Sequence, residues 1–269
     1  MRARVYSAPV QRPADPVIVH SAAVPAPGGP LRVAFIGQPA RLAGSVDDQP
    51  SSPETVNARL TELRPDVVVA LGPGCPPGAL AGISAITVGY LDEPAAFVPG
   101  SFDRVIAADD GLAAEAEEAG TEVWRVLPLP VADHHYRPAR RPTGPARVID
   151  LDGSESPVEL DRADVAVRRG PEGGPAARHA VLRCMAAGVL VVSAPLPSMP
   201  WLEPDIDFVA ADGDERFAEA LETLRRDPAA FHRQRLGGRL KAEWMRASSV
   251  WARVVGDLRR DLSAFGSNR

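Results

Sequence analysis

The stretch ADVAVRRGPEGGPAARHAVLRCMAAGVLVVSAP, residues 163–195, decides the fold class. A short apolar run ends at two arginines, a glycine turn follows, and Pro175 opens a helical pattern that leads to a second apolar run. Proline is favoured at the first helical position because its φ suits a helix and its missing N–H is not needed there. A strand, a helix and a strand in this order predict a parallel βαβ unit, and therefore an α/β protein.

The same alternation continues on both sides of this unit. Ser52 and Pro53 begin a helix with Val56, Leu60 and Leu63 on one apolar stripe. Strands are expected within 31–39, 66–74, 83–94, 102–109, 121–130, 146–153 and 189–197, and further helices at 111–120, 213–228 and across 228–262. This order predicts two Rossmann-like domains, each with a parallel sheet.

Composition places the domain boundaries. Residues 1–30 are rich in Pro, Ala and Gly and are expected to form a loose lead-in, and RPARRPTGP, from Arg137, has no apolar period and is expected to be a linker. The predicted division is an N-terminal domain at 31–138, a linker at 139–145, a C-terminal domain at 146–249 and a last helix at 250–269.

The net charge, the length of the apolar runs and the number of cysteines argue against several classes of protein. The net charge of −5 offers no basic field for nucleic acid. No apolar run approaches the roughly 20 residues of a membrane span, and the N-terminus lacks the apolar core of a signal peptide. Cys75 and Cys184 are too far apart to indicate a zinc site or a disulfide framework. We expect a cytoplasmic protein without an integral membrane segment, and a protein partner or a homo-oligomer stays open.

One segment has the pattern of an anion site. In GPEGGPAARHAVLR, residues 170–183, glycines precede a helix whose first N–H groups and positive dipole end suit a diphosphate. Arg178 and His179 in the first turn add donors, and His179 and Arg183 share a helix face. The alternative, a plain strand-to-helix connection, is common in α/β units and stays open.

Three segments resemble the group 1 retaining glycosyltransferases of the GT-B architecture. Residues 102–138 match the end of that family's N-terminal domain at six positions, Val126, Leu127, Pro128, Val131, Tyr136 and Pro138. Residues 163–228 are similar to its donor-binding half, and SSVWARVVGDL, from Ser248, to its last helix, which packs on the N-terminal domain. In this match His134 and His135 fall on positions of the interdomain crossover that vary in the family. We therefore interpret them as structural residues and not as a metal site.

The resemblance implies a donor site at the start of the second βαβ unit. Glu172 matches the carboxylate that contacts the donor sugar, and Arg183 stands where the family has a glutamate that accepts from the ribose. The family's diphosphate-binding Arg and Lys have no counterpart in LDGSESPVELDR, residues 151–162, which leaves neutralisation to Arg168, Arg169, Arg178 or Arg183. The alternative, that these arginines form a solvated rim, stays open. The implied donor and phosphate residues are Glu172, Gly173, Gly174, Arg178, His179 and Arg183.

The implied activity is transfer of a hexosyl-type sugar from a nucleotide-sugar to a small-molecule acceptor, with retention. No metal and no bound cofactor are expected, because the nucleotide-sugar is a substrate. Tyr90, Asp92 and Glu93 lie at the C-terminal end of a strand of the first sheet and are the acceptor-side candidates. No residue is assigned as a nucleophile. Two alternatives remain, a non-catalytic glycosyltransferase-like binding or partner subunit and a nucleotide-sugar epimerase.

Overall fold

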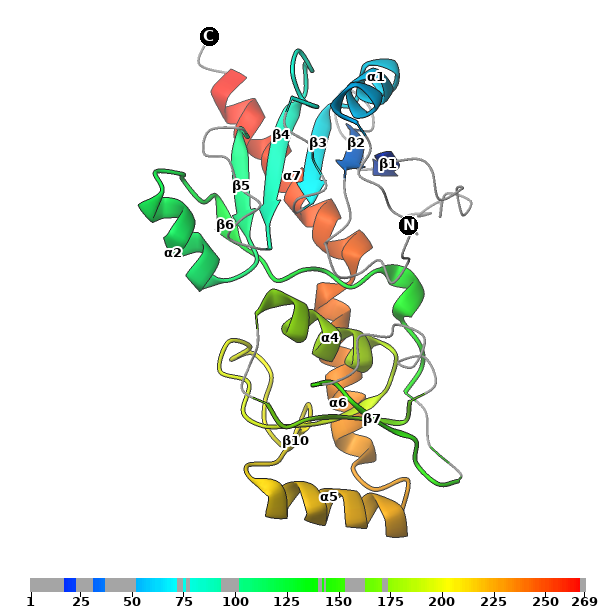
Figure 1. Cartoon of the computed structure of the whole chain (residues 1–269). Helices are drawn as coiled ribbons and strands as arrows, with labels where there is room; N and C mark the ends of the chain where they lie inside the picture. The colour runs from blue at the N-terminus through cyan, green and yellow to red at the C-terminus, as the bar shows by residue number, and fades with distance from the viewer. Residues whose placement is uncertain are drawn as a thin grey trace. The chain divides into compact units, whose positions relative to one another are not determined.

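The chain forms two compact units in the computed structural model (Figure 1). The N-terminal unit comprises residues 1–127 and 252–269, and the C-terminal unit comprises residues 128–251. Within these units the structure describes residues 17–22, 31–36, 52–71, 75, 78–92, 102–139, 142, 144–152, 163–170 and 174–266. None of the helices in these ranges combines the length and the apolar character that a bilayer span requires.

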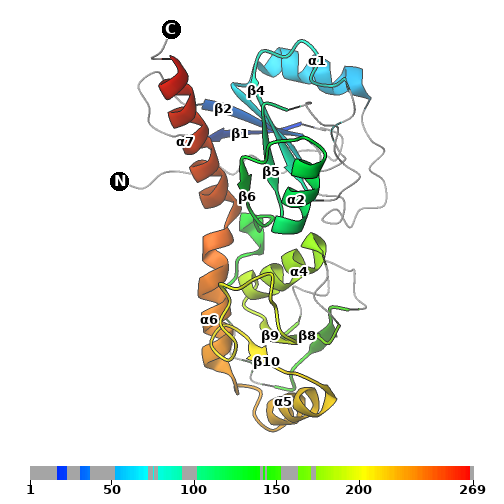
Figure 2. The same ribbon diagram turned by 90° about the vertical axis from the view of Figure 1, so that its left-hand side faces the viewer.

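The N-terminal unit is built on a six-stranded sheet whose strands lie in chain order. The strands are β1 (Val17–Ala22), β2 (Leu31–Ile36), β3 (Val67–Leu71), β4 (Ile86–Leu91), β5 (Arg104–Ala107) and β6 (Arg125–Val126). The strands β2 to β6 are parallel. Right-handed crossovers that always advance in one direction leave their helices on one face. Accordingly, α1 (Pro53–Leu63) and α2 (Asp110–Glu118) cover one face, and the end of α7 (Ala247–Gly266) lies on the other (Figure 2).

The helix α1 begins where the sequence predicts. The Ser52 hydroxyl accepts a hydrogen bond from the Thr55 N–H at 3.3 Å and thereby satisfies one of the free donors of the first turn. Val56 and Leu60 are buried against Ala34, Ile36 and Val68 of the sheet. The predicted cap and apolar stripe of this helix are confirmed.

The strand β1 corrects the prediction of a loose lead-in over residues 1–30. Its six residues pair antiparallel with β2, with Val17 opposite Ile36 and Ala22 opposite Leu31. The run VIVHSA is rich in β-branched residues, which favour strands, but the surrounding Pro and Ala outweighed this signal in the sequence. A β1 strand on this edge covers the N–H and C=O groups of β2.

The C-terminal unit has a four-stranded parallel sheet in the order β10-β9-β8-β7. One face of it packs on α5, where Phe217, Ala220 and Leu224 meet the valines of β8 and β9. The helix α4 crosses from β8 to β9, as a βαβ unit requires. The elements are β7 (Val148–Asp150), β8 (Val165–Arg168), α4 (Pro175–Ala186), β9 (Leu190–Ser193), β10 (Val209–Ala210), α5 (Asp214–Arg226), α6 (His232–Ala242) and η4 (Glu243–Met245).

The crossover segment, residues 128–138, belongs to the C-terminal unit, so the units divide well before the linker expected at 139–145. The Val131 N–H donates to the Met245 carbonyl at 2.8 Å, and the Ala247 N–H donates to the Val131 carbonyl at 2.9 Å. These bonds join the segment to the end of η4 and the start of α7. The boundary therefore follows a tertiary pairing and not the Pro-rich composition of the linker.

The sequence predicts helical structure across residues 228–262. The structure divides this segment into α6, η4 and α7. The helix α6 gives way to the 3-10 turn η4, and Arg246 then adopts an extended conformation before α7 begins. In the N-terminal unit, the Arg125 guanidinium lies 2.7 Å from the Asp257 carboxylate of α7. This ion pair joins β6 to the last helix.

Candidate functional site

The carboxyl edge of the C-terminal sheet collects the polar residues of the predicted donor site. The strands β7, β8 and β9 end there at Asp150, Arg168 and Ser193. The helix α4 starts at the same edge, with Gly174 as its N-cap and Pro175 as its first residue. No side chain of the described residues caps this helix start, where the positive end of the helix dipole lies.

The carboxylate of Asp152 organises the turn that follows β8. Its Oδ2 accepts from the N–H groups of Arg169 at 2.6 Å and Gly170 at 2.8 Å. Its Oδ1 lies 3.8 Å from Nε of Arg168, whose side chain is buried. Gly170 packs so tightly here that a Cβ on it would lie 3.0 Å from the carboxylate. Sequence reasoning missed Asp152, because its partners are distant in the chain.

Arg169 lies at the outer part of the same edge. Its Nη1 is 3.6 Å from Oδ2 of Asp150, and its guanidinium stands 5.6 Å from the centre of the Phe217 ring. About half of the Arg169 side chain is exposed. It can therefore turn toward a bound anion at small cost, whereas Arg168 is held in place.

Arg178 connects the first turn of α4 to the loop after β9. Its Nη1 donates to the Ser198 hydroxyl at 3.1 Å, and only 6% of its surface is exposed. A buried, hydrogen-bonded guanidinium at a helix N-terminus is a preorganised anion donor. The sequence predicted Arg178 for this site, but Ser198 was not predicted.

His179 and Arg183 lie on the face of α4 that contacts the crossover segment of the same unit. The His179 ring is buried and bonds the backbone carbonyl of Pro130. Burial, and secondarily the charge of Arg183, lower the pKa of His179 to about 3. The neutral ring does not supply the charge that we expected from it, because the crossover excludes water from it. Arg183 is buried on the same face.

The remaining predicted residues are divided between the two units. Glu172 and Gly173 lie outside the described residues, as does Glu93. Tyr90 is buried at the end of β4, and its hydroxyl donates to the Leu127 carbonyl at 2.9 Å. Asp92 follows it and is half-buried. Among the described residues, no three His, Cys, Asp or Glu side chains gather in a way that could hold a metal ion.

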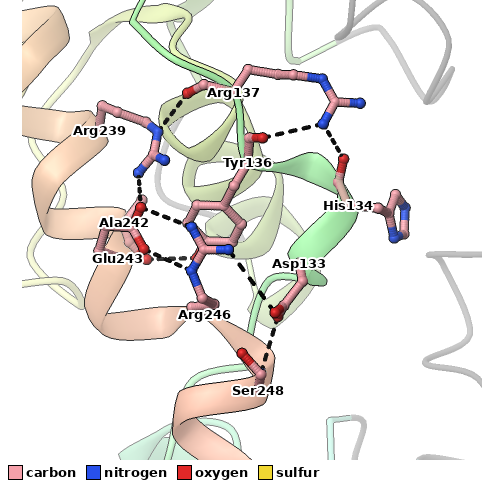
Figure 3. A network of polar contacts seen from close by, with 9 residues as sticks. All are labelled: Asp133, His134, Tyr136, Arg137, Arg239, Ala242, Glu243, Arg246 and Ser248. Carbon is pink, nitrogen blue, oxygen red and sulfur yellow. Dashed lines mark hydrogen bonds and ion pairs between the residues drawn. The ribbon is translucent and has the colours of Figure 1, made fainter. Parts of the chain in front are cut away.

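The paired histidines of the crossover are part of a structural cluster. The rings of His134 and His135 lie 4.0 Å apart on the short 3-10 turn η3 (Asp133–His135), and the His134 carbonyl accepts from Arg137. The next residue, Tyr136, donates to the Ala242 carbonyl (Figure 3). Asp133 accepts from the Ser248 N–H at 3.0 Å. These contacts support the interpretation of the stretch as architecture.

Solved structures share this fold. The chain is similar to HepE from Anabaena in complex with UDP and glucose, with a TM-score of 0.54 and 11% identity over 77% of this chain and 82% of that one. It is similar to sucrose-phosphate synthase from Thermosynechococcus elongatus, with a TM-score of 0.53 and 13% identity over 94% and 87% of the two chains. No protein-family model and no curated protein matches the sequence. At such low identity the likeness establishes the fold, which is the GT-B fold of glycosyltransferases.

Proposed function

We propose that this protein is a glycosyltransferase that moves a hexosyl-type sugar from a nucleotide-sugar to a small-molecule acceptor, with retention. The observation that carries the proposal is the N-terminus of α4, which no side chain of the described residues caps, beside the buried Arg178–Ser198 pair. The fold is compatible with it, and HepE, which has the same fold, is described in complex with UDP-glucose. The resemblance of residues 163–228 to the donor-binding half of the family supports the same assignment.

The proposed role of this edge is to bind the diphosphate and stabilise it as it leaves. When the bond between the sugar and the diphosphate breaks, negative charge grows on the diphosphate oxygens. Fixed donors aimed at that charge stabilise the transition state more than the ground state. The α4 dipole and Arg178 supply such donors without a metal ion, and Arg169 is near enough to the edge to add a second guanidinium.

The alternative, a non-catalytic subunit that kept the fold, is favoured by one specific observation. The Asp152 carboxylate already accepts from the N–H groups of Arg169 and Gly170 and lies beside Arg168. An internal anion in this position competes with a phosphate for the same donors. Arg183, which stands where the family has a ribose-binding carboxylate, can only donate hydrogen bonds.

Nucleotide binding and turnover separate these two functions. The unfolding temperature of the full chain is measured with UDP, GDP, dTDP and ADP in turn, since a ligand at 100 times its Kd adds about 2.7 kcal/mol to the free energy of unfolding. We expect a rise with one nucleotide, and then release of that nucleotide from its sugar conjugate in the presence of acceptors. Binding without turnover supports the non-catalytic subunit, and no rise with any of the four contradicts a nucleotide-sugar site.

A further inference from the structure

The helix α6 has one face that packs closely in its own unit. Arg235, Gly238 and Ala242 are buried along it at a spacing of three to four residues. A Cβ on Gly238 would lie 2.5 Å from the Asp207 carbonyl and 3.1 Å from Cγ of Met185 in α4. This contact brings the α6 backbone close to α4, so the inner face of α6 is fully occupied.

The opposite face carries an exposed apolar stripe. Leu236, Leu240 and Trp244 follow one another at intervals of four residues, and they are 44%, 60% and 62% exposed. Ile206, at 55% exposure, belongs to the loop whose backbone lies against Gly237. Figure 2 shows this loop beside α6. Four of the six large hydrophobic side chains found exposed among the described residues therefore gather here, in what we call the α6 face.

The charges around the α6 face have both signs. Arg233 is exposed on the same side of the helix as Leu236 and Leu240. Glu203, which lies 3.2 Å from Nζ of Lys241, and Asp205 are exposed on the Ile206 side. Two carboxylates beside the stripe and a net charge of −5 oppose binding to an anionic lipid surface. A mixed rim around an apolar centre suits a protein surface with the same mixture.

We propose that the α6 face binds the same face of a second copy of this chain, with the two α6 helices antiparallel about a two-fold axis at Leu240. Leu236 lies four residues, about 6 Å, before Leu240 along α6. Trp244 lies four residues after Leu240, in the adjoining turn η4. The rotation therefore sets Leu240 against Leu240 and Leu236 against Trp244. It also turns Arg233 toward the Trp244 ring and the Glu203 carboxylate of the second copy, where it would join Lys241 of that copy, which already contacts both groups. Such an interface is self-complementary, as two-fold contacts must be.

The proposal is tested on the full chain by sedimentation over a range of concentrations. The wild type is expected to approach twice the 28.5 kDa mass of one chain at about 100 μM, since an interface centred on a few side chains binds in the micromolar range. Leu240→Glu and Leu240→Lys should each stay at the mass of one chain. An equimolar mixture of the two should associate again, because a residue on the axis meets its own copy and opposite charges then face each other.

Val148→Glu is the control, because Val148 is 49% exposed in the same unit but lies on β7, away from α6, and should leave the association unchanged. A wild type that keeps the mass of one chain at about 100 μM overturns the proposal. So does association that persists in Leu240→Glu, or a Glu and Lys mixture that stays dissociated. Binding of the wild type to phosphatidylcholine vesicles that is lost in Leu240→Glu would instead assign the face to a membrane and overturn the second copy as its occupant.

Discussion

The phenolic oxygen of Tyr136 lies 2.6 Å from the carbonyl oxygen of Ala242 and donates a hydrogen bond to it. The Tyr136 ring is covered by the guanidinium of Arg246 at 3.9 Å and approached by that of Arg239 at 4.9 Å. Glu243 bonds both arginines and holds them in place (Figure 3). One aromatic residue thus fixes the crossover segment to the end of α6.

Tyr136→Phe is expected to lower the free energy of unfolding of the C-terminal unit by about 1–3 kcal/mol, because the change leaves the buried Ala242 carbonyl without its donor while the ring stays. The measurement is urea unfolding followed by circular dichroism. Tyr90→Phe removes a hydroxyl donor in the N-terminal unit and serves as the comparison, since its partner carbonyl of Leu127 is only partly buried. Equal stability of Tyr136→Phe and the wild type would contradict a structural role for the hydrogen bond.

The buried ring of His179 predicts a loss of stability in mild acid. Its pKa is about 3 in the folded chain and about 6.5 in the unfolded chain, so between these values only the unfolded state binds the proton. Stability is unaffected above pH 6.5 and falls as the pH drops below it, with a slope that approaches about 1.4 kcal/mol per pH unit. Chemical denaturation at several pH values from 7 to 5 measures this slope.

The variant His179→Gln should flatten that slope, because glutamine has no proton to gain, while His134→Gln, at an exposed position, should leave it unchanged. The measurement stays above pH 5 so that the acid titration of Glu243 does not contribute to the slope. Hydrogen bonds from Arg246 hold the pKa of Glu243 near 2, and that carboxylate costs stability only below pH 4.5. A wild-type slope that survives in His179→Gln would show that another group causes it.

Elements coded by short-range patterns were predictable from the sequence. Ser52, Pro53 and the stripe of Val56 and Leu60 determine α1 within eleven residues of chain, and Pro175 marks the start of α4 in the same way. Arg178 could be placed in the first turn of α4 from the sequence, because a helix start beside a strand end is a local arrangement. In each case the residues that determine the helix or its start are close together in the sequence, so the spacing of apolar and capping residues reveals them.

Features set by distant contacts were not predictable. Asp152 looked like a loop residue, yet its carboxylate binds N–H groups that follow β8. His179 shares a helix face with Arg183, as expected, but the crossover segment that covers this face is remote in sequence. The strand β1 depends on β2 for its pairing, and its short run lies among prolines. The periodicity of one sequence does not show which of its distant segments are in contact.

Gly188 is expected to be among the least replaceable residues of the C-terminal unit. Its φ is 72°, and a Cβ there would lie 2.7 Å from the Pro138 carbonyl and 2.8 Å from Cα of Ala139, both backbone atoms that cannot turn aside. Gly213 in the same unit has a φ of 81° and nothing within 4 Å of its Cβ position. Gly213→Ala should cost about 1 kcal/mol for the left-handed conformation alone, and Gly188→Ala clearly more. Equal costs in thermal unfolding would contradict the close contact with the crossover.

Arg178→Gln tests the proposed phosphate site with a side chain that can still bond Ser198 but carries no charge. Loss of a charge-assisted hydrogen bond to a diphosphate is expected to weaken nucleotide binding about 10- to 100-fold, equivalent to roughly 1.5–3 kcal/mol. Arg225→Gln removes an exposed arginine at the C-terminal end of α5, the end away from this edge, and should bind the nucleotide as the wild type does. Calorimetric titration with the nucleotide that stabilises the wild type provides the comparison. Equal affinities of Arg178→Gln and Arg225→Gln would remove Arg178 from the proposed donor site.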